Sequence, residues 1–388
     1  MNEGGIKKRF VLAILIVMAV LSFSANKFLA GCGDSPFAPS TSTTTTTGTV
    51  TTLPTPTTSN TVPIVTSTTT ITTTSSTTTT STTTTTIALS WTLMTDAPGF
   101  SSRSGHASVT TRINTNYYLW IIGGNSGTLT NDAWVLVNVG AWMEGTPEAA
   151  FSCREGHSTA QYYMTDTISI PFVIGGRETG GSRKNDVWYT DDYYIWEQAT
   201  ATAEFGARCD HASLRYEHDG VAYMWVIGGE GNSGLYNDVW YSQLGGTWEV
   251  ATTSAAFSPR KGHCLLSFDN KIWLIGGYDG AYKNDVWYSS DGISWTQATS
   301  SAAFAPRYDH AAARIDDFMW VIGGSTEASP YNNDVWYSND GVNWLRASDA
   351  DFTPRCGHTC TAHQSRLWVI GGQTSTGKQD DVWYLDPF

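Results

Sequence analysis

Six Arg-x-x-His pairs are the residues of this chain whose types and spacing could do chemistry. Guanidinium groups that converge could bind an anion, and imidazoles that converge could hold a metal ion. The pairs recur, however, at one fixed place in a repeated pattern, whereas a catalytic or metal site needs a few unlike groups. We therefore predict that the pairs are structural, and we expect no catalytic residue, no metal and no cofactor. The pairs are Arg103/His106, Arg154/His157, Arg208/His211, Arg260/His263, Arg307/His310 and Arg355/His358.

Two further motifs come close to known chemistry. The segment 372–378 nearly spells a phosphate-binding loop, but Gln379 stands where Ser or Thr should hold magnesium, and a predicted strand follows in place of a helix. Cys356, His358 and Cys360 alternate along one predicted strand, and three side chains on one strand cannot close a tetrahedron around zinc. We expect neither a nucleotide nor zinc.

The pairs belong to a repeat that runs from about residue 88 to 388. Each unit has an apolar run that ends in a Gly pair, a variable loop, a second run that contains Trp, and a third segment that begins with Trp. Successive units lie about 47 to 54 residues apart, the length of one four-stranded propeller blade. The Asp of the recurring Asn-Asp-Val-Trp motif is expected to open a strand and not to bind calcium. The Gly pairs are 123–124, 175–176, 228–229, 276–277, 323–324 and 371–372, which we number units 1 to 6.

This pattern resembles kelch-type β-propellers over residues 88–388. The resemblance implies an all-β fold, a six-bladed kelch-like β-propeller with four-stranded blades. All seventeen Trp fall on repeat positions, where they should fill the gaps between sheets. The sixth unit stops after its third strand, whereas residues 88–94 carry a fourth-strand Trp ahead of the first unit. We therefore expect residues 88–94 to pair with 381–385, so that the N-terminal strand closes the last blade and removes the exposed edge that a three-stranded blade would leave.

The amino terminus resembles a bacterial lipoprotein signal peptide, residues 1–31. Basic residues 7–9 precede an apolar run, 10–23, that is short for a membrane span, and the segment Leu29-Ala30-Gly31-Cys32 resembles a lipobox, in which the Cys is acylated. We predict lipidation at Cys32 and an exported protein, lipid-anchored to the cell envelope at the outer membrane or cell surface. An ordinary cleaved signal and a retained signal anchor stay open as alternatives, because Lys27 interrupts the apolar approach to the lipobox.

Residues 32–87 are dominated by Thr and Ser and carry almost no charge. Such a segment buries too little apolar surface to offset its ordering entropy, so we predict a disordered tether. Removal of the four basic residues and one acidic residue in 1–31 lowers the net charge from −13 to −16. This charge argues against nucleic acid as a partner.

We interpret the chain as a surface-tethered, monomeric propeller that binds or scaffolds a protein or carbohydrate ligand. The loops after the Gly pairs differ most between units and should emerge on one face, although they could also vary without function. Candidate binding residues on these loops are Arg177, Arg183, Lys184, Tyr236, Tyr278 and Tyr331.

The family resemblance also implies an alternative, because some kelch-type propellers are sugar mutarotases or epimerases. A carbohydrate-active enzyme would need only a few polar groups at the channel mouth, so catalysis stays open, with a binding module favoured. Among the cysteines, Cys153 and Cys209 flank the equivalent Arg in neighbouring units and are the best candidates for a disulfide.

Overall fold

The computed structural model describes residues 88–386. The predicted signal peptide, the lipidation site Cys32 and the predicted tether up to residue 87 lie outside the described residues, as do residues 387–388. Within the described part, no helix has both the length and the apolar character needed to cross a membrane.

The regular elements of residues 88–386 are all β-strands. Units 1 to 3 comprise β2 (Ala107–Ile113), β3 (Asn116–Asn125), β4 (Leu129–Val137), β5 (Trp142–Thr146), β6 (Arg154–Glu155), β7 (Ser158–Thr165), β8 (Ile168–Glu178), β9 (Arg183–Tyr189), β10 (Glu197–Thr200), β11 (Arg208–Cys209), β12 (Ala212–His218), β13 (Val221–Gly231), β14 (Gly234–Ser242) and β15 (Glu249–Thr252). Units 4 to 6 comprise β16 (Cys264–Phe268), β17 (Lys271–Tyr278), β18 (Tyr282–Ser289), β19 (Thr296–Thr299), β20 (Arg307–Tyr308), β21 (Ala311–Ile315), β22 (Phe318–Thr326), β23 (Asn332–Ser338), β24 (Leu345–Arg346), β25 (Thr359–His363), β26 (Arg366–Thr374), β27 (Gly377–Leu385) and, from the start of the described chain, β1 (Trp91–Thr95).

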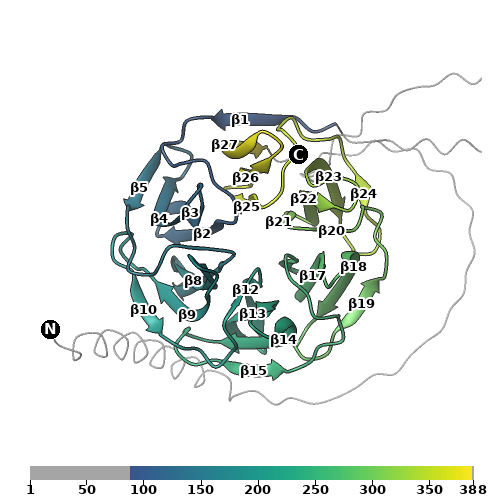
Figure 1. Ribbon diagram of the computed structural model, residues 1–388, viewed down its shortest axis with the longest axis horizontal. Coiled ribbons are helices and arrows are strands. Elements are labelled where there is room, and N and C mark those ends of the chain that lie inside the picture. Colours follow the sequence, from purple (N-terminus) through teal and green to yellow (C-terminus); the bar gives the residue numbers. More distant parts are fainter. Residues whose placement is uncertain (1–87, 387–388) are drawn as a thin grey trace, which may run out of the picture. The chain divides into compact units, whose positions relative to one another are not determined.

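Antiparallel pairing repeats from unit to unit. Unit 4 has the order β16-β17-β18-β19, and the same order of first to fourth strand recurs in the others, with the two-residue strands β6, β11 and β20 added beside three of them. Figure 1 shows these groups of strands arranged around a common centre. In unit 6 the outer place is taken by β1, which pairs with β27 so that Trp91 lies opposite Leu385 and Leu93 opposite Trp383. The expected pairing of residues 88–94 with 381–385 is therefore present.

Burial along the strands follows the hydrophobic pattern of the sequence. The second strands are buried on both faces, as in β17, where residues 272–277 are all buried. First strands alternate between buried and half-buried positions, as in β2. Fourth strands such as β19 and β24 are the most exposed. This gradient agrees with a second strand that is covered by neighbouring sheets and a fourth strand at the outer edge.

A Phe and a Trp pack edge to face in every unit. The Phe precedes the repeat Arg by three residues, and the Trp opens the fourth segment; their ring centroids lie between 5.0 and 5.3 Å apart. In unit 6 the partner of Phe352 is Trp91 of β1, at 5.2 Å. The first described strand thus supplies the aromatic contact that the other units take from the start of their own fourth strand or the residue directly before it. The pairs are Phe100/Trp142, Phe151/Trp196, Phe205/Trp248, Phe257/Trp295, Phe304/Trp344 and Phe352/Trp91.

The predicted disulfide between Cys153 and Cys209 is wrong. All five cysteines of the described residues are free thiols. Cys153 precedes the repeat Arg of its unit and its thiol donates to Asn131 Oδ1 (3.5 Å), whereas Cys209 follows the repeat Arg and donates to Asp210 Oδ2 (3.4 Å). The two positions flank equivalent residues from opposite sides, so their side chains meet different partners.

Candidate functional site

The Arg of each Arg-x-x-His pair lies inside a repeated network of hydrogen bonds. In unit 6, Arg355 donates to both carboxylate oxygens of Asp381 (2.7 and 2.8 Å), to the carbonyl of Gly371 (2.7 Å) and to the carbonyl of Thr353 (3.0 Å). Its guanidinium also lies over the ring of Phe352, 4.8 Å from the centroid. At most 1% of any of the six Arg is exposed. The equivalent ion pairs are Arg103–Asp132, Arg154–Asp186, Arg208–Asp238, Arg260–Asp285 and Arg307–Asp334.

These ion pairs account for the recurring Asp of the third strand. Asp381 also accepts a hydrogen bond from Trp383 Nε1 (2.7 Å). Burial alone would raise the pKa of Asp381, but the hydrogen bonds from Arg355 and Trp383 hold this pKa below its usual value. The network ties the segment before the first strand, the Gly pair and the third strand of a unit together, and it uses the Arg and Asp side chains to hold the fold.

The six His are buried around a central cavity of about 260 Å³. Burial, and then the charge of the neighbouring Arg, lower the pKa of His106, His157, His263 and His358 to about 3. The pKa values of His211 and His310 are lowered for the same two reasons. All six imidazoles are therefore neutral near pH 7.

The second Gly of each pair makes room for the His of the same unit. A Cβ on Gly124 would lie 2.7 Å from Cβ of His106, and Gly124 has a φ of +102° that other residues rarely adopt. A side chain on this glycine would clash with the histidine, which explains why the Gly pair and the histidine recur together.

The residue before each repeat His belongs to a closed ring of hydrogen bonds, which we call the collar. Each backbone N–H donates to the carbonyl of the equivalent residue in the preceding unit, at 2.7 to 3.0 Å, and Gly105 donates to Gly357, so the six bonds form a cycle. All six residues have φ between +50° and +62°, a region that favours Gly and tolerates Asp. The collar consists of Gly105, Gly156, Asp210, Gly262, Asp309 and Gly357.

On the side of the collar that faces the loops after the Gly pairs lies a second cavity of about 280 Å³, which we call the mouth cavity. Residues that follow the repeat Arg or the Gly pair surround it, and these two positions carry a different side chain in almost every unit. Repeat positions that pack inside the fold are identical, whereas a binding site needs unlike groups, so the mouth cavity is the candidate site. It is lined by Ser104, Glu155, Arg177, Lys261, Tyr308, Cys356 and Gln373 together with collar residues.

The three basic residues predicted to bind a ligand are all paired with carboxylates. Arg177 lines the mouth cavity and binds Glu155 (2.8 Å), Arg183 binds Glu230 (2.9 Å), and Lys184 binds Glu178 (2.9 Å). Glu230 also accepts a hydrogen bond from Lys261 (2.6 Å). Arg183 and Lys261 thus share Glu230, whereas Arg177 and Lys184 each pair with a different carboxylate. These cations do not form an unpaired basic patch.

The three predicted Tyr differ in their surroundings. Tyr236 lies 4.5 Å from the guanidinium of Arg208, so its ring is part of the packing of unit 3. Tyr278 contacts Tyr308, with 5.6 Å between ring centroids, and Tyr308 lines the mouth cavity. Tyr331 is half-buried, and its backbone carbonyl accepts a hydrogen bond from Ser329.

Asp210 and Asp309 are functional candidates that the sequence analysis missed. Among residues 88–386 neither carboxyl group forms an ion pair, although Arg177 and Lys261 lie near enough to lower their pKa values. Burial, the larger effect, raises both pKa values, and with the added charge of Asp210 the pKa of Asp309 reaches about 7. The available signal was the Arg-x-Gly-His pattern, in which two units have Asp in place of Gly.

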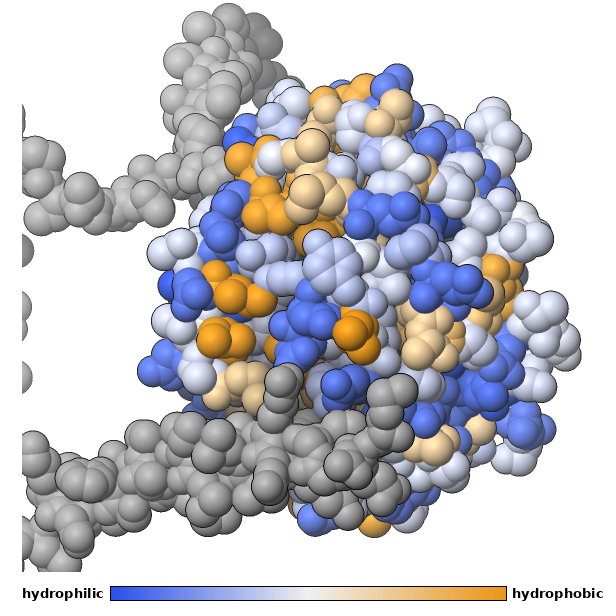
Figure 2. Space-filling view, turned by 90° about the vertical axis from the view of Figure 1, so that its left-hand side faces the viewer, coloured by the Kyte–Doolittle hydropathy of each residue, from blue (hydrophilic) through white to orange (hydrophobic). Residues whose placement is uncertain are grey.

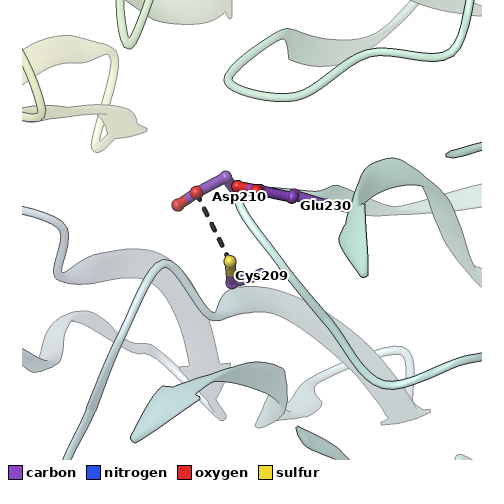
Figure 3. Close-up of side chains that lie close together, drawn as sticks. All are labelled: Cys209, Asp210 and Glu230. Atoms are coloured by element: carbon purple, nitrogen blue, oxygen red, sulfur yellow. Dashed lines mark hydrogen bonds between the residues drawn. The ribbon is translucent and has the colours of Figure 1, made fainter. Parts of the chain in front are cut away.

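Cys209, Asp210 and Glu230 place a thiol and two carboxyl groups within 4.8 Å of one another. Figure 3 shows the Cys209 thiol donating to Asp210, with Glu230 beside it. Burial and the charge of Asp210 raise the pKa of Cys209 to about 12, so the sulfur is protonated, and Glu230 is already bound to two cations. Since metal ions bind the thiolate and an available carboxylate, we assign no metal to this cluster.

The comparison with curated proteins gives no match. The family model of the KLHDC2/KLHL20/DRC7 Kelch-repeats domain matches residues 69–277 and 262–388. Together with the all-strand fold and its recurring pairing, this match shows that the chain belongs to the kelch-repeat family and forms a kelch-type β-propeller.

Proposed function

We propose that the chain is a six-bladed propeller, closed by its N-terminal strand, that is tethered to the cell envelope and binds a protein partner through its mouth face. The mouth face is the side on which the loops after the Gly pairs emerge around the mouth cavity. Kelch-repeat domains are typical protein-interaction scaffolds, and the family match covers the repeats of this chain. The bounds proposed are 1–31 for a signal peptide, 32–87 for a tether and 88–388 for the propeller.

Two observations support six blades and closure. The collar contains one residue from each of six units, and its hydrogen bonds return from Gly357 to Gly105. In addition, β1 pairs with β27 and gives Trp91 to the aromatic pair of unit 6. The pairing of β1 with β27 covers the edge that a three-stranded last blade would expose, and the edges that stay are the short outer strands, which favours the monomer.

Tethering is proposed from the sequence alone. The lipobox-like segment at Cys32 implies a lipid anchor and an exported protein, and the Thr/Ser-rich residues 32–87 would hold the propeller away from the membrane. An acidic propeller should not adhere to anionic lipid, so the anchor is the only membrane contact that we propose.

One observation carries the proposed binding face: equivalent positions of the repeat hold unlike side chains around the mouth cavity. Packing does not require different side chains at these positions, because the backbone repeats from unit to unit. We propose Arg177, Arg183, Lys184, Tyr236, Tyr278 and Tyr331 as contacts at the rim. On the side of the molecule in Figure 2, hydrophobic residues form small separate groups among polar ones on the surface that is not covered, so this side is a weaker candidate for an interface.

A carbohydrate-active enzyme is a second candidate, favoured by one observation. Asp309 lies at the mouth cavity with a pKa of about 7, which suits a group that gives and takes a proton near neutral pH. A sugar mutarotase or epimerase would need such a group beside hydrogen-bonding side chains. Measurement by NMR of anomer interconversion and of epimer formation with common aldoses tests this candidate, and the absence of any acceleration of either reaction would exclude it.

The proposed function is tested by capture of partners from a cell-surface extract on the immobilised full-length chain, with a glycan array in parallel. A triple variant, Arg177→Ala, Arg183→Ala and Tyr236→Ala, should capture the same partner about tenfold less well. A matched control carries Arg314→Ala, Arg366→Ala and Tyr163→Ala in or beside the strand-connecting hairpins on the opposite face. Equal capture by both variants would place the interface elsewhere.

A further inference from the structure

The mouth cavity has more negative than positive groups that are free to act on a ligand. Three carboxyl groups line it, those of Glu155, Asp210 and Asp309, and two cations, Arg177 and Lys261. Arg177 is bound to Glu155, and Lys261 to Glu230. The carboxyl groups of Asp210 and Asp309 are left without an ion pair in the described residues.

The backbone fixes these two carboxyl groups at the floor of the cavity. Both residues belong to the collar, with φ of +53° and +50°. The Oδ1 atom of Asp210 lies over Gly156, only 2.3 Å from where a Cβ on that residue would be, and Oδ1 of Asp309 lies 2.7 Å from the corresponding point on Gly262. Each Asp therefore uses the space that the glycine of the preceding unit leaves.

We propose that the mouth cavity binds the cationic end of a Lys or Arg side chain from the protein partner, with Asp210 and Asp309 as its two acceptors. This inference rests on the proposed protein-binding function and names the chemistry of the partner. A guanidinium or ammonium group supplies several donors to two carboxyl groups that otherwise form no ion pair in the described residues.

The wall of the cavity fits the same ligand. Tyr308 lines the cavity and packs against Tyr278 and Tyr282, at 5.6 and 5.4 Å between ring centroids, so its ring is held in place. An aromatic ring beside two carboxylates attracts a cation and covers the methylene groups of a long basic side chain. An anionic ligand would instead meet the two unpaired carboxylates, because both nearby cations already have partners.

Binding of a cation should depend on pH. A cation stabilises the ionised form of both Asp, so binding near pH 7 should release protons, and affinity should rise between about pH 6 and pH 8. The other titratable or charged groups that face the two Asp are Glu155, Arg177, Cys209, Glu230, Lys261, Cys264, Tyr308 and Cys356. Each of the four charged groups has an ion-pair partner. Hydrogen bonds to these partners raise the pKa values of Arg177 and Lys261 and lower that of Glu230, and burial raises the pKa values of the three thiols and of Tyr308 to about 12, so none of these seven groups should change charge in this range.

The test is calorimetric titration of the full-length chain with blocked Gly-Gly-X-Gly-Gly peptides in which X is Arg, Lys, Gln or Glu. We expect binding of the Arg and Lys peptides at about pH 8, about tenfold weaker binding at pH 6, and proton release that shows as a dependence of the heat on the buffer. The double variant Asp210→Asn and Asp309→Asn should bind the Arg peptide at least about tenfold less well. Asn keeps the left-handed backbone conformation, and each single variant should show part of the loss if the double variant folds poorly.

The matched control is Asp316→Asn, an exposed Asp with φ of +49° in a hairpin on the opposite face. It should bind the Arg peptide as the parent chain does. Equal binding of the Gln and Arg peptides would overturn the inference. A second contrary result would be that no peptide binds, whereas calcium chloride or a monosaccharide binds to the parent chain and not to the double variant. If the rim variants lose a captured partner and the Arg and Lys peptides do not bind, the inference fails and the proposed function stands.

Discussion

Replacement of Asp309 by Asn should stabilise the fold by an amount that grows with pH. In the folded protein the pKa of Asp309 is raised from 3.8 to about 7, chiefly by burial and then by the charge of Asp210. Between these two pH values the folded chain binds more protons than the unfolded chain, so the free energy of unfolding falls as pH rises. At about 1.4 kcal/mol for each pKa unit, the loss is roughly 4 kcal/mol at most by pH 8, and solvation of the carboxyl group by water in the mouth cavity reduces it to about 2 to 4 kcal/mol.

The assay is urea unfolding of the parent chain and of Asp309→Asn at several values between about pH 4 and pH 8. The neutral amide removes the cost of the buried charge, so the difference in unfolding free energy should be near zero at pH 4 and reach about 2 to 4 kcal/mol at pH 8. Asp316→Asn serves as the control, because its carboxyl group is exposed and its backbone conformation is the same. A difference between parent and Asp309→Asn that does not change with pH would refute the account of Asp309 as a buried carboxyl without a counter-ion.

Three further predictions concern the fold and the anchor. Deletion of residues 88–95 removes the strand that pairs with β27 together with a buried Trp, and it should lower the melting temperature by about 10 °C or more in a calorimetric scan. Gly156→Ala should lower the free energy of unfolding in urea more than Gly105→Ala does. Both glycines have φ of +62°, but only a Cβ at residue 156 would clash with Asp210. In a chain that also carries Asp210→Gly, the two Ala variants should therefore be equally stable. Cys32→Ala should move the protein from the membrane to the soluble fraction after centrifugation, whereas a variant that stays with the membrane at its unprocessed mass would indicate a signal anchor.

The fold could be predicted because the same packing contacts recur in all six units. A Gly pair at one place in every unit is needed for the contact with the repeat His, as Gly124 and His106 show, and the Trp of the third strand recurs because it donates to the buried Asp. A residue that is needed at the same place in every unit recurs in the sequence at the spacing of the repeat. The pairing of residues 88–94 with the last strand followed from the same period, since a fourth-strand Trp preceded the first unit.

The sequence predicted less well which side chains contact each other across the fold. The Arg and the Asp of one ion pair, such as Arg103 and Asp132, are separated by a whole hairpin, and periodicity cannot tell which recurring residue meets which. The same limit explains the error over Cys153 and Cys209, whose nearness in the repeat does not give the directions of their side chains. Arg177 and Arg183 of unit 2 looked free in the sequence because their acceptors, Glu155 and Glu230, lie in other segments.

The collar shows where function should be sought in a repeat protein of this kind. Loops vary for many reasons, so their variety says little about which loop binds. A collar position is different, because its backbone conformation favours Gly and its neighbours are identical units. Asp at two of these positions adds backbone strain and places a half-buried carboxyl group there without an ion pair, and the preceding glycines must stay small to accommodate it. The nearby cations Arg177 and Lys261 each pair with another carboxylate, so a ligand that brings a further cation is the simplest physical reason for the presence of these two Asp.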